Sequence, residues 1–124
     1  MSSRVGKMQG VMIDPMDLRE FLLAHARARE SVTYAEALGA FGYSFSRPKM
    51  RALCKILGDV DAHARGRDEP ELAVLVVRQS DRLPGQGWWV AGGAEGYKGL
   101  WEGPGARRHV AKLQKRVFDY WAGR

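Results

Sequence analysis

The chain has 124 residues, a formal net charge of +6 at pH 7, and a single cysteine. This length suits one compact domain, and an apolar share of 45% is enough to build a core. One cysteine excludes an internal disulfide bond and a zinc site made of cysteines. The longest apolar run, residues 72–77, is far too short to span a bilayer, and no signal-peptide segment opens the chain. These features predict a bacterial-type cytoplasmic protein that does not enter a membrane.

The positive charge is concentrated in two segments. Residues 47–67 carry six basic and two acidic side chains, and residues 104–124 carry six basic and one acidic side chain. Residues 1–46 carry five of each sign, and residues 68–103 carry three basic and six acidic side chains. A segregated basic surface is typical of a protein that binds a polyanion. The alternative is an ordinary solvated surface.

In chain order, residues 1–12 are expected to form a flexible arm, and residues 13–124 a single winged-helix-like domain. The first predicted helix runs from Pro15 to about Glu30. Asp14 is a favourable N-cap residue, and proline is well tolerated at the first helical position.

A short second helix is predicted to follow a capping box. Thr33 and Glu36 have the T-x-x-E spacing in which the threonine oxygen accepts from a free N–H and the glutamate reaches back to the cap. Gly42 is suited to end this helix. After a tight turn, Ser46 is expected to cap a third helix, with Pro48 in its first turn. Two helices joined by such a turn form a helix-turn-helix pattern.

The third helix has an apolar face and a basic face. Its apolar positions repeat every three or four residues and are Met50, Leu53, Leu57, Val60 and Ala64. The basic side chains of its first three turns, among which no acidic residue stands, are Arg47, Lys49, Arg51 and Lys55. The N-terminal part of a recognition helix meets base edges, where arginine can bond to guanine and lysine mainly contacts phosphate. We therefore expect this face to bind DNA, the alternative being a solvated helix face.

A β-hairpin is predicted after the third helix. The apolar segment "ELAVLVVR" is typical of a strand with both faces largely covered, and "WWVAG" is its predicted partner, with Pro84 and Gly85 at the turn. The loop between them is the candidate wing, because Arg78 and Arg82 can meet phosphate there. Alternation along a strand would send Trp88 and Trp89 to opposite faces, one into the core and the other toward the last helix or a partner.

A glycine-rich, irregular segment and a final helix complete the chain. Tyr97, Leu100 and Trp101 are expected to pin the irregular segment to the core. The apolar stripe of the final helix comprises Val110, Leu113, Val117 and Trp121. Its basic residues Lys112, Lys115 and Arg116 either touch flanking phosphates or face solvent.

Together these elements predict the α+β class and a winged helix-turn-helix, with three N-terminal helices, a β-hairpin wing and a C-terminal helix. The expected DNA-binding residues are Arg47, Lys49, Arg51, Lys55, Arg78, Arg82, Lys112, Lys115 and Arg116.

The sequence offers no catalytic, metal or cofactor motif. His25, His63 and His109 fall on separate predicted helices, and none has a second histidine or a cysteine at metal-ligand spacing. Lys55 could lower the pKa of the Cys54 thiol, but a small, partly buried apolar role fits this helical cysteine better. We therefore assign no catalytic residue, no metal ligand and no cofactor.

The stretch "TYAEALGAFGYSFSRPKMRALCKIL" resembles the DNA-binding winged-helix domain of the O6-alkylguanine-DNA alkyltransferase superfamily. The matching residues are Thr33, Tyr34, Glu36, Ala37 and Leu38, followed by Arg51, Ala52 and Leu53. The resemblance covers about 30 residues and implies a DNA-binding scaffold. The superfamily's reactive Pro-Cys-His-Arg-Val block is absent, and Cys54 is not its counterpart, so the resemblance does not extend to alkyl transfer.

Residues 30–122 also resemble a group of small bacterial and phage domains. The resemblance rests on the order and spacing of the helix pair, of "EPELAVLVVRQSDRLPGQGWW" and of the aromatic end "RVFDYWAG". Some of these domains stand beside nuclease domains in restriction-like or phage proteins. The resemblance implies a DNA-associated module without a defined activity.

The sequence thus predicts a protein that binds double-stranded DNA, either a transcriptional regulator or a phage- or restriction-associated factor. An alternative is a protein-interaction module on the same scaffold, as a homodimer or with another partner. Its interface anchors would be Trp88, Trp89, Trp101 and Trp121. A weaker alternative is a component of a DNA-processing or repair enzyme.

Overall fold

A computed structural model describes residues 11–124, so the arm predicted over residues 1–12 lies outside the described residues except for its last two. The elements in order are α2 (Pro15–Arg27), β1 (Val32–Thr33), α3 (Tyr34–Ala40), α4 (Arg47–Gly66), the 3₁₀ turn η1 (Ala73–Leu75), β2 (Val76–Val77), α5 (Gln86–Trp88), the π-helical turn η2 (Trp89–Gly93) and α6 (Gly103–Trp121). The fold therefore mixes helices with a small amount of strand.

The caps predicted from the sequence set the starts of the first three described helices. The Asp14 side chain accepts from the N–H of Met16 at the start of α2. Thr33 and Glu36 form both halves of a capping box at α3, and Ser46 accepts from the N–H of Lys49 at α4. These contacts satisfy N–H groups that have no partner within a helix. The predictions of these three helix starts are confirmed.

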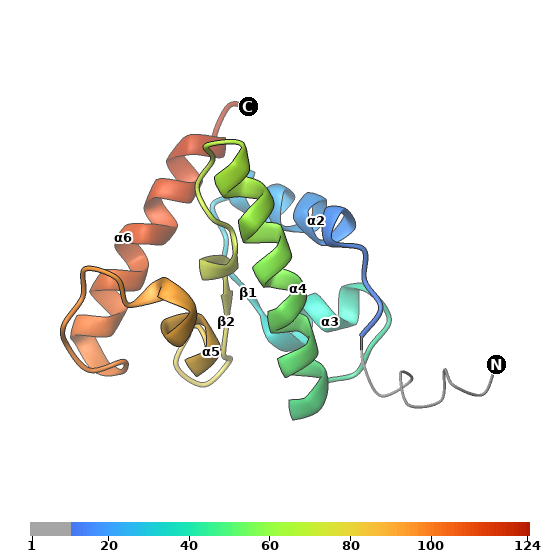
Figure 1. Cartoon of the computed structure of the whole chain (residues 1–124), viewed down its shortest axis with the longest axis horizontal. Coiled ribbons are helices and arrows are strands. Elements are labelled where there is room, and N and C mark those ends of the chain that lie inside the picture. Colours follow the sequence, from blue (N-terminus) through green and yellow to red (C-terminus); the bar gives the residue numbers. More distant parts are fainter. Residues whose placement is uncertain (1–10) are drawn as a thin grey trace.

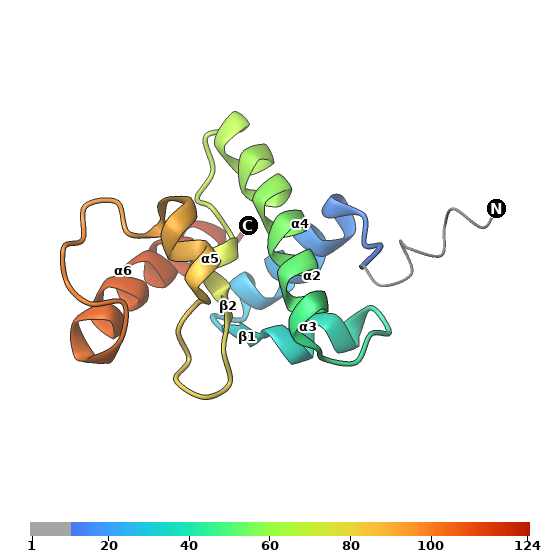
Figure 2. The same cartoon turned by 60° about the horizontal axis from the view of Figure 1, so that its bottom comes forward.

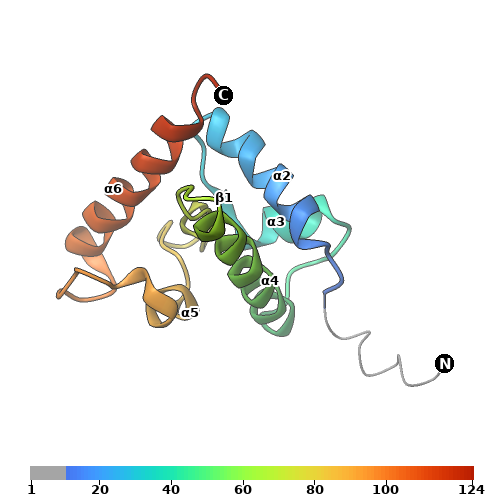
Figure 3. The ribbon, with the colours of Figure 1, turned by 45° about the horizontal axis from the view of Figure 1, so that its top comes forward.

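The two short strands lie in the middle of the molecule, with helices around them (Figure 1). They pair in parallel, with Val32 opposite Val76 and Thr33 opposite Val77. All four of these side chains are buried. Helix α2 contacts both α4 and α6, and α3 contacts α4. Figure 3 shows α2 and α6 on either side of α4.

The predicted β-hairpin is wrong. Val76 and Val77 do form a strand, but their partner is β1, which lies far earlier in the chain. The expected second strand, "WWVAG", is helical, because residues 86–93 form α5 and η2. No hairpin wing is present among the described residues.

Local contacts explain why residues 84–93 turn instead of extending. The indole N–H of Trp89 donates to the carbonyl of Pro84 at 3.2 Å, and the N–H of Trp88 donates to the carbonyl of Gly85 at 3.0 Å. Gly92 then adopts a φ of 127°, a backbone conformation that glycine adopts readily because it has no Cβ. The turn ends there. Backbone groups that a hairpin would pair with a strand are therefore satisfied within the turn.

The last helix, α6, begins at Gly103, before the predicted apolar stripe of residues 110–121. Val110, Val117 and Trp121 are buried as expected, whereas Leu113 is half-buried. The end of the chain returns to α2, since Arg27 Nε donates to the carbonyl of Arg124 at 3.0 Å. None of the described helices is long and apolar enough to cross a membrane.

Candidate nucleic-acid interface

The first half of α4 presents a row of exposed cations. Arg47, Arg51 and Lys55 stand four residues apart and are all exposed. None of them forms an ion pair with any residue from 11 to 124. The first acidic residue of the helix is Asp59. This face therefore keeps its positive charge free for an anionic partner.

Lys49 belongs to the same half-helix but lies differently. It is half-buried, and its Nζ donates to Ser44 Oγ at 3.4 Å. The contact draws its ammonium group back over the turn between α3 and α4. Lys49, which was predicted to contact DNA, therefore lies at the edge of the row formed by Arg47, Arg51 and Lys55.

The opposite face of α4 holds the helix in the core. Leu53, Leu57 and Val60 are buried, as the apolar spacing predicted. Asp61 is also buried, and its Oδ1 accepts from the N–H groups of Leu72 and Ala73 at 2.7 and 2.9 Å. This carboxylate fixes the start of η1 against α4. Burial raises the pKa of Asp61 to about 6, although the two N–H groups oppose the rise.

A loop after β2 lies against the N-terminal half of α4. The N–H of Gly85 donates to the hydroxyl of Tyr34 at 2.8 Å. A Cβ added at Gly85 would lie 2.9 Å from Met50 Cε, so the loop and α4 are in close contact there. In Figure 2, with the lower end of the molecule turned forward, this loop protrudes beside the start of α4. Gln86 and Gly87 at its end are exposed.

Tyr34 and Cys54 lie beneath this contact. Burial is the largest cause that raises the pKa of the Tyr34 hydroxyl. Burial also raises the pKa of the half-buried Cys54 thiol, which a contact with Tyr34 only partly offsets. The thiol pKa is therefore raised by burial and is not lowered by the neighbouring Lys55.

The two arginines expected on the wing are engaged elsewhere. Arg78 makes two hydrogen bonds to the carboxylate of Asp81, at 3.2 and 2.9 Å. Arg82 Nη2 donates to Ser31 Oγ at 2.7 Å, which turns this side chain toward the start of β1. The N–H of Arg78 also bonds to the carbonyl of Leu83 at 2.8 Å and closes the loop. The structure does not bring these arginines into the row on α4.

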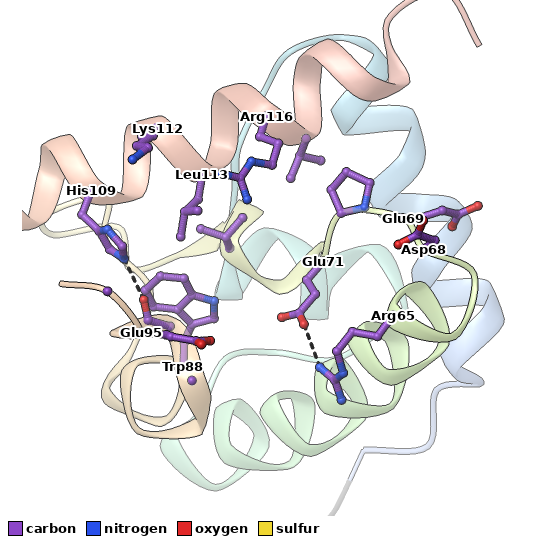
Figure 4. Close-up of a pocket in the computed structure, with 16 residues that line it drawn as sticks. Arg65, Asp68, Glu69, Glu71, Trp88, Glu95, His109, Lys112, Leu113 and Arg116 are labelled. Carbon is purple, nitrogen blue, oxygen red and sulfur yellow. Dashed lines mark hydrogen bonds and ion pairs between the residues drawn. The ribbon is translucent and has the colours of Figure 1, made fainter.

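The predicted basic residues of α6 divide into two groups. Lys115 pairs with Asp119 at 2.7 Å, and Asp119 also pairs with Arg29. Lys112 and Arg116 form no ion pair within residues 11–124 and line a cavity of about 580 Å³ between α6, η2 and the loop after α4 (Figure 4).

The sequence did not reveal the aromatic cluster beside this cavity. The Trp89 and Trp101 rings stack at 5.7 Å, and the Tyr97 and His109 rings stack at 4.8 Å. His109 Nε2 lies 2.7 Å from the carbonyl of Gly93. The sequence shows how many aromatic residues there are. It does not show which rings stack, because the stacked residues lie far apart in the chain.

The four tryptophans differ in their exposure. Trp89 and Trp121 are buried, and Trp88 is half-buried. Trp101 remains 38% exposed, close to Leu100, which is 74% exposed rather than pinned to the core as expected. Trp101 is therefore the tryptophan most available to a partner.

The three histidines lie on α2, α4 and α6, as predicted. Across residues 11–124, no group of three histidine, cysteine, aspartate or glutamate side chains is placed to hold a metal ion. No protein-family model, curated protein or solved structure matches this chain.

Proposed function

We propose that this protein binds double-stranded DNA through the N-terminal half of α4. The observation that carries the proposal is the row of Arg47, Arg51 and Lys55, which is exposed and free of ion pairs with the described residues. Elsewhere on the described surface, several basic side chains are paired with acids; they include Arg65, Arg67, Arg78 and Lys115.

The arrangement of α3 and α4 supports a helix-turn-helix mode of binding. In this mode, α4 lies in the major groove with its first turns against base edges. Arg47 and Arg51 are then placed to bond to guanine or phosphate, and Lys55 to bond to phosphate. The resemblance of residues 33–53 to the alkyltransferase DNA-binding domain supports the same helix pair.

The wing in this proposal is the loop of residues 78–85 rather than a hairpin. The hydrogen bond between Gly85 and Tyr34 ties it to the start of α3, and Gly85 also lies close to Met50 of α4. Gln86 and Gly87, which follow this loop at the start of α5, are exposed. Arg78 and Arg82 contribute only if they leave Asp81 and Ser31.

A salt-titrated binding assay tests the proposal. The double variant R47Q/R51Q is compared with R107Q/R108Q, which removes the same charge from exposed positions on α6. If both arginines of α4 contact phosphates, the slope of log affinity against log salt becomes shallower by about 1.8 in the first variant. If they read bases, each costs about 1–3 kcal/mol on the preferred site. Equal losses in the two variants would contradict a specific role for α4.

A protein-interaction module is a second candidate, favoured by three large apolar side chains that are exposed. Val90, Leu100 and Trp101 are 67%, 74% and 38% exposed. Apolar association survives high salt because it is not screened. Light scattering at about 0.5 M salt would then show a dimer or a complex, and the double variant L100S/W101S would be dissociated. A monomer under these conditions argues against this candidate for self-association.

A further inference from the structure

We infer that the cavity between α6, η2 and the loop after α4 binds a small organic molecule that combines a flat aromatic ring with an anionic group. Its volume of about 580 Å³ falls in the range of ligand sites, about 300–1,000 Å³. The inference does not depend on DNA binding, because the cavity lies outside the row of cations on α4.

The anionic group is assigned to the α6 wall. Lys112 and Arg116 stand one turn apart there, and both line the cavity. Lys115 on the same helix finds a carboxylate at 2.7 Å, whereas neither of these two has one among the described residues. A guanidinium or an ammonium group on this wall can hold a carboxylate or a phosphate.

The ring is assigned to the space beside Trp88. This indole lines the cavity and is half-buried, and Leu113 adds an apolar contact from α6 (Figure 4). Trp88 can lie where it does because residue 93 is glycine. A Cβ at that position would be 2.4 Å from two ring carbons of Trp88. Aromatic rings pack well on such an indole.

Acidic side chains on the other wall set the direction of the ligand. Glu71 is held by Arg65 at 2.8 Å, and Glu95 forms no ion pair with another described residue. Both line the cavity, as do Asp68 and Glu69. Glu69 is paired with Arg19 and Arg67, whereas Asp68 forms no ion pair with another described residue. An anion is repelled by Asp68 and Glu95 and attracted by α6, so the ring and any ring N–H point away from α6, toward Glu95.

The test uses four small probes and the indole N–H signals of the isotope-labelled full chain. Indole-3-acetate and phenyl phosphate carry a ring and an anion, tryptamine carries a ring and a cation, and acetate carries no ring. The Trp88 signal is assigned with W88F. We expect indole-3-acetate or phenyl phosphate to shift this signal saturably, with no shift at Trp121. The stronger of the two identifies a carboxylate or a phosphate as the anionic group.

Charge variants locate the anion. K112Q/R116Q should weaken binding of the anionic probe about tenfold or more, whereas R107Q/K115Q, with the same loss of charge, should not. Binding of tryptamine as tight as that of either anion, no saturable shift, or equal effects of the two variants would overturn the inference. So would a K112Q/R116Q variant that loses affinity for duplex DNA and keeps the probe, since these cations would then contact DNA phosphates.

Discussion

At the scale of single residues, two glycines decide the shape of the surface beside α6. Gly92 takes a φ of 127°, and Gly93 leaves room for the ring of Trp88. The carbonyl of Gly93 also meets His109. The glycines at the end of "GWWVAGG" therefore allow the Trp88 ring to pack against the backbone.

Alanine at residue 93 should destabilise the protein by about 1–3 kcal/mol, because its Cβ overlaps the Trp88 ring. Gly58 is the matched control. It lies exposed within α4 with nothing near its missing Cβ, so alanine there should stabilise by about 0.5–1 kcal/mol. Urea unfolding measures both changes. If G93A is as stable as the native protein, the packing described for Trp88 is wrong.

The hydroxyl of Tyr34 should contribute more to the unfolding free energy than an ordinary hydrogen bond does. Tyr34 and Gly85 are both buried, so Tyr34→Phe leaves the N–H of Gly85 without its partner. We expect a loss of about 1–3 kcal/mol in unfolding free energy. Hydrogen exchange at Gly85 is the matching local measurement, and unchanged protection there would show that the loop is held by other contacts.

At the scale of elements, the sequence predicted α2, α3, α4 and α6 because their signals are local. A cap and its partner lie within three residues, as in Thr33 with Glu36 and Ser46 with Lys49. Apolar spacing on α4 also identified its buried face. The cationic row on the opposite face follows from the same periodicity.

The sequence could not show that the hairpin is absent, because the strand pairing of residues 76–77 depends on residues far away in the chain. Valine-rich residues 74–77 are typical of a strand, but nothing local states that Val76 pairs with Val32. In the same way, Trp89 has strand preference, yet its ring packs on Tyr97, Trp101 and His109. Tertiary packing outweighed local preference in residues 86–93.

The join between α4 and η1 should respond to pH. In the folded protein, burial raises the pKa of Asp61 to about 6 from 3.8, so the folded state binds this proton more tightly than the unfolded chain. Its contribution to stability is complete below the unfolded value and is lost as pH rises through 6. Between about pH 7 and pH 5 the native protein should gain about 1 kcal/mol relative to D61N.

The D61N variant is a fair comparison because the amide oxygen of its new side chain can still accept from the N–H groups of Leu72 and Ala73. Other carboxyls, such as Asp81 and Asp119, have lowered pKa values and act in the opposite direction in both proteins. The difference between the two proteins therefore isolates Asp61. Parallel stability curves over this pH range would exclude the raised pKa.

At the scale of the whole molecule, the two basic segments of the sequence have different surroundings. The segment on α4 has at its N-terminal half a row of cations without an ion pair among residues 11–124, while its C-terminal Arg65 and Arg67 are paired with acids. The segment on α6 borders a cavity and pairs one lysine with Asp119. The sequence located both segments, but only side-chain partners distinguish the free cations from the paired ones.

The most direct test of the proposed DNA surface is a map of amide shifts in the labelled full chain during titration with duplex DNA at low salt. DNA binding by α4 predicts shifts over residues 44–55 and 84–88 that disappear as salt is raised. No shift in these two segments, or shifts confined to the neighbourhood of Val90, Leu100 and Trp101, would contradict it.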